Sequence, residues 1–183
     1  FQLRADILLA KGDAAGAEAA AKELAQYDPL SAAMVRAGLR RSAGKHADAA
    51  AELEAVFGKT LTETTEVAEG QPTYAAVGFQ LAEDFDKAGN AEAAAAILDT
   101  LCYAGIGKDE QARAHMAMAE RLSTKTDKAS LIAAFDHAMM AVALSRTQRN
   151  AVRKVTKSIL EQFDKDASMK DEVAEYRGYL NAL

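Results

Sequence analysis

The chain has 183 residues, of which half are hydrophobic but only 6% are aromatic, and its formal net charge is −5. This length is enough for one domain or a short array of smaller units, and folding does not require a metal or disulfide staple. The acidic balance argues against a broad nucleic-acid-binding surface, and no apolar stretch approaches the roughly 20 residues that span a bilayer. We therefore expect neither nucleic-acid binding nor membrane contact from this segment.

Helical periodicity runs along almost the whole chain. No run of residues alternates with period two for long enough to predict a strand. The two prolines, Pro29 and Pro72, both stand where a helix would begin after a turn. The pattern predicts ten helices, at 1–11, 14–27, 30–43, 46–57, 72–88, 90–103, 109–123, 128–144, 147–164 and 168–182.

Short turns divide these predicted helices into pairs. A glycine can adopt the left-handed conformation that closes one helix, and an Asp or Asn after it can cap the next. Such turns predict helical hairpins in series. The turns are Gly12-Asp13, Gly44-Lys45, Gly89-Asn90 and, as a weaker fourth copy, Thr126-Asp127.

Residues 58–72, GKTLTETTEVAEGQP, interrupt this regular order. The segment is rich in Thr and Glu, and Leu61 and Val67 are its apolar anchors, so we expect a loop with one extra helical turn. Connections of this length are uncommon in compact helical proteins and are often functional. A tolerated surface insertion is the simpler alternative.

The residues after each turn repeat a size pattern. The fifth position is small and the twelfth is apolar, and both offsets lie on one face of a helix. A small residue there would let another helix pass close by. The positions concerned are Ala17, Ala49 and Ala94, followed by Leu24, Val56 and Leu101.

This pattern resembles the tetratricopeptide repeat, a unit of about 34 residues with paired antiparallel helices and small residues where they cross. The resemblance covers about residues 1–144, as four hairpins with an insertion near 58–72, although Leu131 occupies a position that should be small. It implies an all-α fold of hairpins stacked as a right-handed solenoid, against the alternative of a generic helical bundle. The first unit matches best, through Phe1, Ala5, Leu8, Gly12, Ala17, Ala21, Leu24 and Pro29.

Residues 145–183 break the repeat register and predict a helix pair that caps or continues the array. Ser145 and Gln148 have the spacing of a capping box. The last helix carries an apolar stripe that either closes the final repeat or pairs with another chain, which would make a homo-oligomer. The stripe consists of Met169, Val173, Tyr176, Leu180 and Leu183.

A basic stripe lies opposite the apolar face of the predicted helix at 147–164. An acidic partner or anionic lipid headgroups would suit it, and an ordinary solvated face is the alternative. The stripe consists of Arg146, Arg149, Arg153 and Lys157, with Lys154 alongside.

The residue types that usually carry chemistry show no convincing pattern. His46, His115 and His137 are assigned to different hairpins, and none is four residues from another histidine, so we expect them to be structural or solvated. Cys102 has no partner base and is expected to be a buried thiol that forms no intrachain disulfide. The sequence therefore predicts no catalytic residue, metal or cofactor.

The resemblance implies that a partner binds the concave face, which is built from the first helix of each pair. We expect adaptable apolar contacts from the methionines and the phenylalanine there, and acidic groups that favour a partly basic partner. Filling of these positions by a neighbouring helix of the same chain is the alternative. The predicted partner-binding residues are Asp6, Met34, Arg41, Phe79, Glu83, Asp86, Met116 and Glu120.

The expected function is that of a noncatalytic scaffold or adaptor segment of a larger protein, which binds another polypeptide or self-associates. Phe1 in place of an initiator Met suggests that the chain was cut from a longer protein. Alanine-rich, irregular repeats of this kind look bacterial, so we expect a segment from the bacterial periplasm or cytoplasm. A peptide-sensing regulatory domain of an enzyme or transcription factor is the alternative, and a stand-alone enzyme is a third.

Overall fold

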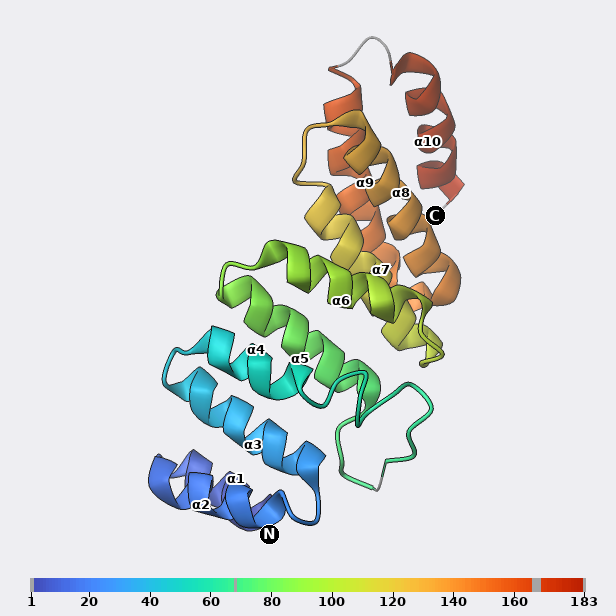
Figure 1. Cartoon of the computed structure of the whole chain (residues 1–183). Helices are drawn as coiled ribbons and strands as arrows, with labels where there is room; N and C mark the ends of the chain where they lie inside the picture. The colour runs from blue at the N-terminus through green and yellow to red at the C-terminus, as the bar shows by residue number, and fades with distance from the viewer. Residues whose placement is uncertain (1, 68, 166–168, 183) are drawn as a thin grey trace. The chain divides into compact units, whose positions relative to one another are not determined.

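The computed structural model describes residues 2–67, 69–165 and 169–182, and these ranges contain ten α-helices and no β-strand (Figure 1). The predicted all-helical class is confirmed, and every helix bound lies within three residues of the sequence-based expectation. The chain divides into two compact units, Phe1–Ile97 and Leu98–Leu183, and the division falls inside α6 (Ala91–Tyr103). Each unit is described by itself below.

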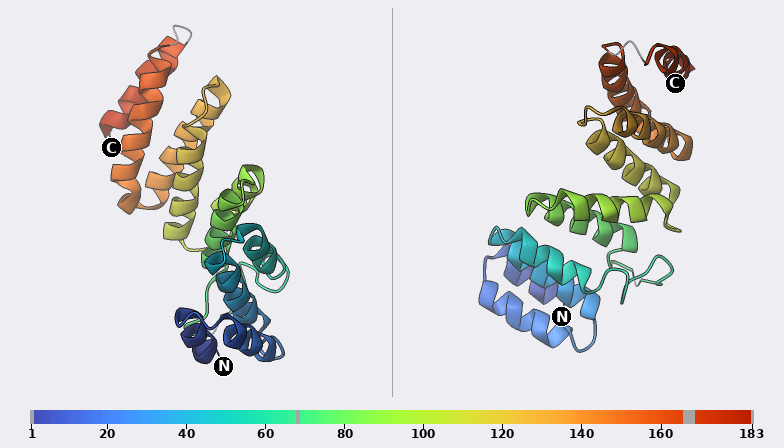
Figure 2. Two further views of the ribbon diagram at one scale, coloured as in Figure 1. Left: turned by 90° about the vertical axis from the view of Figure 1, so that its left-hand side faces the viewer. Right: turned by 45° about the horizontal axis from the view of Figure 1, so that its top comes forward.

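In the first unit, helices α1 to α5 pack against one another along the chain. Neighbouring helices α1 to α5 are in contact in sequence order, and α1 also contacts α3 (Figures 1 and 2). The unit contains α1 (Gln2–Ala10), α2 (Ala14–Leu24), α3 (Pro29–Ser42), α4 (His46–Glu54), α5 (Tyr74–Lys87) and the part of α6 (Ala91–Tyr103) up to Ile97.

The turns form for the reasons that the sequence indicates. Gly12, Gly44 and Gly89 have φ of 75°, 70° and 80°, the left-handed region that favours glycine. The side chain of Asp13 then accepts a hydrogen bond from the backbone N–H of Gly16 at 2.9 Å. Each of these turns therefore ends one helix and starts the next within a few residues.

The repeated small positions are buried. Ala17, Ala49 and Ala94 are each 0% exposed, as expected for places where another helix passes close to the backbone. Leu24 and Val56, the apolar positions later in the pattern, are also buried. The core of the first hairpins consists of Ala5, Ala17, Ala20, Ala21, Val35 and Leu39.

The Thr-rich insertion, residues 58–72, contacts other parts of the first unit. No helix is assigned among residues 58–67 and 69–72, which form hydrogen-bonded turns such as Thr65 N–H to Thr62 O. Leu61 is buried, and the ring of Phe57 stacks on Tyr74 with centroids 4.4 Å apart. Near its end, Gln71 donates a side-chain hydrogen bond to Asp28 Oδ2 at 2.6 Å, so the insertion is attached at both ends.

The second unit is a helical array around one apolar cluster. Helices α7 to α10 contact one another in sequence order, and α7 also contacts α9 (Figure 2). Phe135, Ile159 and Phe163 are among its most buried residues. The unit contains the end of α6, α7 (Lys108–Leu122), α8 (Lys128–Leu144), a 3-10 turn at Arg146–Gln148, α9 (Arg149–Phe163) and α10 (Lys170–Ala182).

The C-terminal stripe is covered by the chain itself. Met169 and Val173 are buried in the core of the second unit, and Tyr176 stacks on Phe135 with ring centroids 3.8 Å apart. Leu183 lies outside the described residues. Ser145 caps the 3-10 turn, not α9, because its hydroxyl accepts from the backbone of Thr147. These contacts favour the capping interpretation of the last two helices.

Candidate functional site

Three of the predicted partner-binding residues share a face of α5. Phe79 is half-buried, while Glu83 and Asp86 follow it by four and seven residues and are exposed. A hydrogen bond from Lys87 Nζ, 2.6 Å from Glu83 Oε1, holds the pKa of Glu83 below its ordinary value. Glu83 is therefore charged at neutral pH and paired with Lys87, and with Asp86 it places two carboxylates and one ammonium group beside an aromatic ring.

The remaining predicted residues of the first unit are placed differently. Met34 on α3 is half-buried, and the side chain of Asp6 lies outside what the structure describes. Arg41 Nε donates to both carboxylate oxygens of Asp84, at 3.0 and 2.8 Å, and its Nη2 donates to Gln80. Arg41 thus makes an internal ion pair in the place where a partner contact was expected.

The ion-pair partner of Arg41, Asp84, was not predicted from the sequence. Its carboxylate is 2% exposed and also lies 3.2 Å from His46 Nδ1. A signal for it exists, because Asp84 shares a helical face with the core residues Val77 and Leu81 at steps of four and three. A carboxylate on such an apolar face requires a buried partner.

In the second unit the two predicted partner-binding residues differ in solvent exposure. Glu120 on α7 is exposed, whereas Met116, one turn earlier, is only 5% exposed and packs in the core with Phe135 and Ile159. Neighbouring helices of the same chain therefore cover Met116. This was the alternative to partner binding at these positions.

The basic stripe on α9 is a solvent-exposed surface. Val152, Val155 and Ile159 occupy the opposite, buried face of this helix. No ion pair with another described residue is found for the stripe. Its exposed members are Arg146, Arg149, Arg153 and Lys157, with Lys154 beside them.

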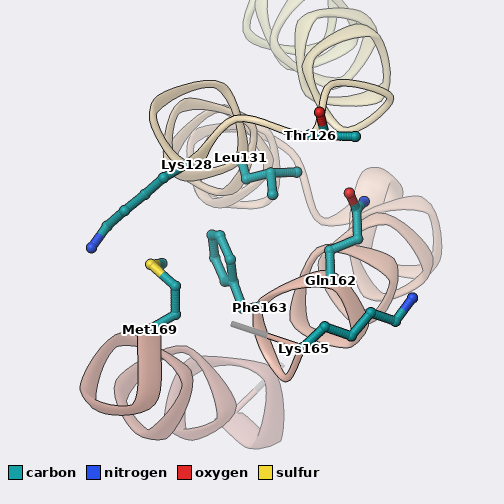
Figure 3. Close-up of a pocket in the computed structure, with 7 residues that line it drawn as sticks. All are labelled: Thr126, Lys128, Leu131, Gln162, Phe163, Lys165 and Met169. Atoms are coloured by element: carbon teal, nitrogen blue, oxygen red, sulfur yellow. The ribbon is translucent and has the colours of Figure 1, made fainter. Parts of the chain in front are cut away.

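A hollow of about 270 Å³ opens where α8 begins and α9 ends (Figure 3). Its floor is made of the core side chains Leu131, Phe163 and Met169, and Lys128 and Lys165 stand at its edge. The Lys128 ammonium pairs with Glu172 at 2.9 Å. The volume lies below the usual range of ligand pockets, and the polar groups do not converge on one point, so the hollow does not indicate a binding site.

Three residues without an assigned role meet in the second unit. Cys102 stands in the last turn of α6, His115 in the middle of α7 and His137 in the middle of α8. The Nδ1 atoms of the two histidines lie 2.8 Å apart, and the cysteine sulfur and one nitrogen of each ring all lie within 4.8 Å of one another. The assignment of His115 and His137 to different hairpins is wrong.

The two histidines face each other because they belong to one hairpin. His115 and His137 are each 11 residues from Thr126 in the turn between α7 and α8. In an antiparallel pair, residues equally far from the turn lie at the same level. Spacing along a single helix, the criterion used above, does not detect such a pair.

Burial controls the charge of this cluster. Desolvation, reinforced by the carboxylate of Asp99, raises the pKa of the Cys102 thiol to about 12. Desolvation also lowers the pKa of His115 and of His137, and Asp99 opposes this shift at both rings. At neutral pH the thiol is protonated and the rings are neutral, so one Nδ1–H donates to the other Nδ1. Cys102 is thus no activated nucleophile.

No protein-family model, curated protein or solved structure matches the chain. Within the described ranges, no helix combines the length and the apolar character that crossing a membrane requires.

Proposed function

We propose that this chain is a noncatalytic interaction scaffold, built from tetratricopeptide-like hairpins, that holds a partner polypeptide on the first helices of its helix pairs. The observation that carries the proposal is the packing of first helix on first helix, which is found in both units: α1 contacts α3, and α7 contacts α9. Stacked repeats use this contact to form a continuous layer of first helices.

The approach of α1 to α3 supports this layer in atomic detail. A Cβ atom added to Gly38 of α3 would lie 2.9 Å from Leu9 Cδ2 of α1. An alanine at this position would have to displace the end of the Leu9 side chain, so Gly38 leaves room for the close approach of α1 and α3. Glycine in the middle of a helix costs roughly 1 kcal/mol relative to alanine.

The partner surface that fits best in the first unit is the face of α5 with Phe79, Glu83 and Asp86. Two exposed carboxylates beside a half-buried aromatic ring suit a polypeptide segment that carries basic and apolar residues. In the second unit, described by itself, Glu120 is an exposed carboxylate on the first helix α7. Arg41 and Met116 are left out of this surface because both are engaged inside the chain.

Charge reversal on α5 tests the proposal. Partners captured by the wild-type chain are purified, and their affinities are measured for wild type and for the double variant Glu83→Lys, Asp86→Lys. Loss of complementary charge should weaken binding about 10-fold or more. The matched control is Asp48→Lys with Glu54→Lys, which reverses two exposed carboxylates on the second helix α4. Equal affinity of all three proteins for every partner would exclude the α5 face.

A further inference from the structure

The cluster of Cys102, His115 and His137 is independent of the scaffold surface and has the composition of a metal centre. In the described part of the chain it is the one group of three or more His, Cys, Asp or Glu residues whose ligand atoms converge. Its members come from three successive helices, so the arrangement is fixed by tertiary packing and not by one flexible loop. Cys102 and His115 are each 2% exposed, and His137 is half-buried.

These ligand types select a particular kind of ion. Imidazole nitrogen together with thiolate sulfur suits Zn²⁺, Co²⁺ or copper, whereas Mg²⁺ and Ca²⁺ require oxygen ligands. Three protein ligands leave one position of a tetrahedron open for water.

The distances are close to those of a tetrahedral site. Bond lengths to zinc of about 2.05 Å for nitrogen and 2.3 Å for sulfur place two nitrogens about 3.3 Å apart, and a nitrogen and the sulfur about 3.6 Å apart. The two Nδ1 atoms are now 2.8 Å apart, and the sulfur lies within 4.8 Å of each ring's ligand nitrogen. Opening the histidine pair by about 0.5 Å and drawing in the thiol by up to about 1.2 Å would give these separations.

We propose that Cys102, His115 and His137 bind one zinc-class divalent ion, with water as the fourth ligand. Asp99 lies one turn before Cys102 on α6, and its carboxylate acts electrostatically on all three ligands. A divalent ion, the Cys102 thiolate and the Asp99 carboxylate together carry no net charge. This balance reduces the cost of placing the ion in a mostly buried site.

The ion would replace a hydrogen bond as the link between helices. Without metal, the Nδ1–H···Nδ1 hydrogen bond joins α7 to α8, and α6 contacts this pair through a hydrogen bond between the Cys102 backbone and His115, while the Cys102 thiol takes no part. With metal, the last turn of α6 is joined to both helices of the hairpin. Binding to the folded chain alone stabilises it by linkage, so the metal should raise the melting temperature of the second unit.

The test is a titration of tag-free, chelator-treated protein with Co²⁺. One equivalent should give the intense visible bands of tetrahedral Co²⁺ and a near-ultraviolet thiolate-to-metal band. Cys102→Ser should abolish the near-ultraviolet band, and Cys102→Ser and His137→Asn should each weaken Zn²⁺ binding about 100-fold or more, as measured by competition with a chromophoric chelator. His46→Asn, which alters the histidine outside the cluster, should bind as wild type does.

Zinc K-edge X-ray absorption of the loaded wild-type protein gives a second measurement that needs no substitution. One sulfur and two imidazole nitrogens around the ion support the site. A shell without sulfur, octahedral Co²⁺ spectra, no binding at one equivalent, or equal affinity of folded Cys102→Ser and wild type would each overturn the proposal. The hydrogen-bonded histidine pair would then be the whole role of the cluster.

Discussion

The guanidinium of Arg41 on α3 holds the buried carboxylate of Asp84 on α5, with Nε 2.8 Å from Oδ2. Asp84 also lies 3.2 Å from His46 Nδ1, so this carboxylate of α5 contacts both helices of the second hairpin, α3 through Arg41 and α4 through His46. The contact spans 43 residues of sequence. It links helices that are separated by the insertion, and it places a charge in an otherwise alanine-rich interior.

Arg41→Ala is expected to destabilise the first unit by about 3–5 kcal/mol, because it leaves the Asp84 carboxylate buried without its main partner. The neighbouring substitution Arg40→Ala is the matched control. Arg40 lies 3.7 Å from Glu18 and from Glu52 at a partly exposed position, so its loss should cost about 1 kcal/mol or less. Urea unfolding followed by circular dichroism measures both, and equal losses would show that the pair contributes nothing specific.

The local features of this fold could be predicted from the sequence, and the contacts between helices could not. Gly12 followed by Asp13 specifies a turn within a few residues, and buried Ala17 follows from a spacing on one helix face. The meeting of His115 with His137, by contrast, depends on how two antiparallel helices align. Arg41 is a second example. It occupies a repeat position at which a partner contact is expected, but its side chain forms an ion pair with Asp84 of another helix.

The small-residue positions make a sharp prediction about helix crossing. Ala17→Leu should destabilise the first hairpins by about 1–3 kcal/mol or more, because Ala17 is fully buried against its neighbours and a larger side chain must displace them. Ala19→Leu on the same helix is exposed and should change the free energy of unfolding by about 0.5 kcal/mol or less. Thermal unfolding of both variants gives the comparison. Equal melting temperatures would show that Ala17 is not a site where two helices pack closely.

Met116 distinguishes a core residue from a partner contact. Met116→Ala should cost about 2–5 kcal/mol, because the side chain fills space in the core of the second unit. Glu120→Ala, one turn later and exposed, should leave the unfolding free energy unchanged within about 0.5 kcal/mol. If Met116→Ala unfolded at the wild-type urea concentration and instead weakened partner binding, Met116 would belong to the interaction surface.

The lowered pKa of Asp28 predicts that part of the free energy of unfolding depends on pH. It caps α3 by accepting from the backbone N–H and hydroxyl of Ser31, and it accepts from Gln71 of the insertion. Burial acts to raise the pKa of Asp28, but these hydrogen bonds outweigh burial and hold the pKa below its ordinary value. The charged form is therefore favoured in the folded chain.

A carboxyl group whose pKa is lowered by folding stabilises the protein above its unfolded pKa of about 3.9, and this contribution is lost as the pH falls through the folded value. Asp28→Asn keeps a capping side chain but removes the charge, so wild type should be more stable by up to about 1 kcal/mol at pH 7. That advantage should shrink below about pH 4, as measured by urea midpoints from pH 7 to pH 2.5. A difference that stays constant over this range would mean that the charge of Asp28 does not contribute to stability.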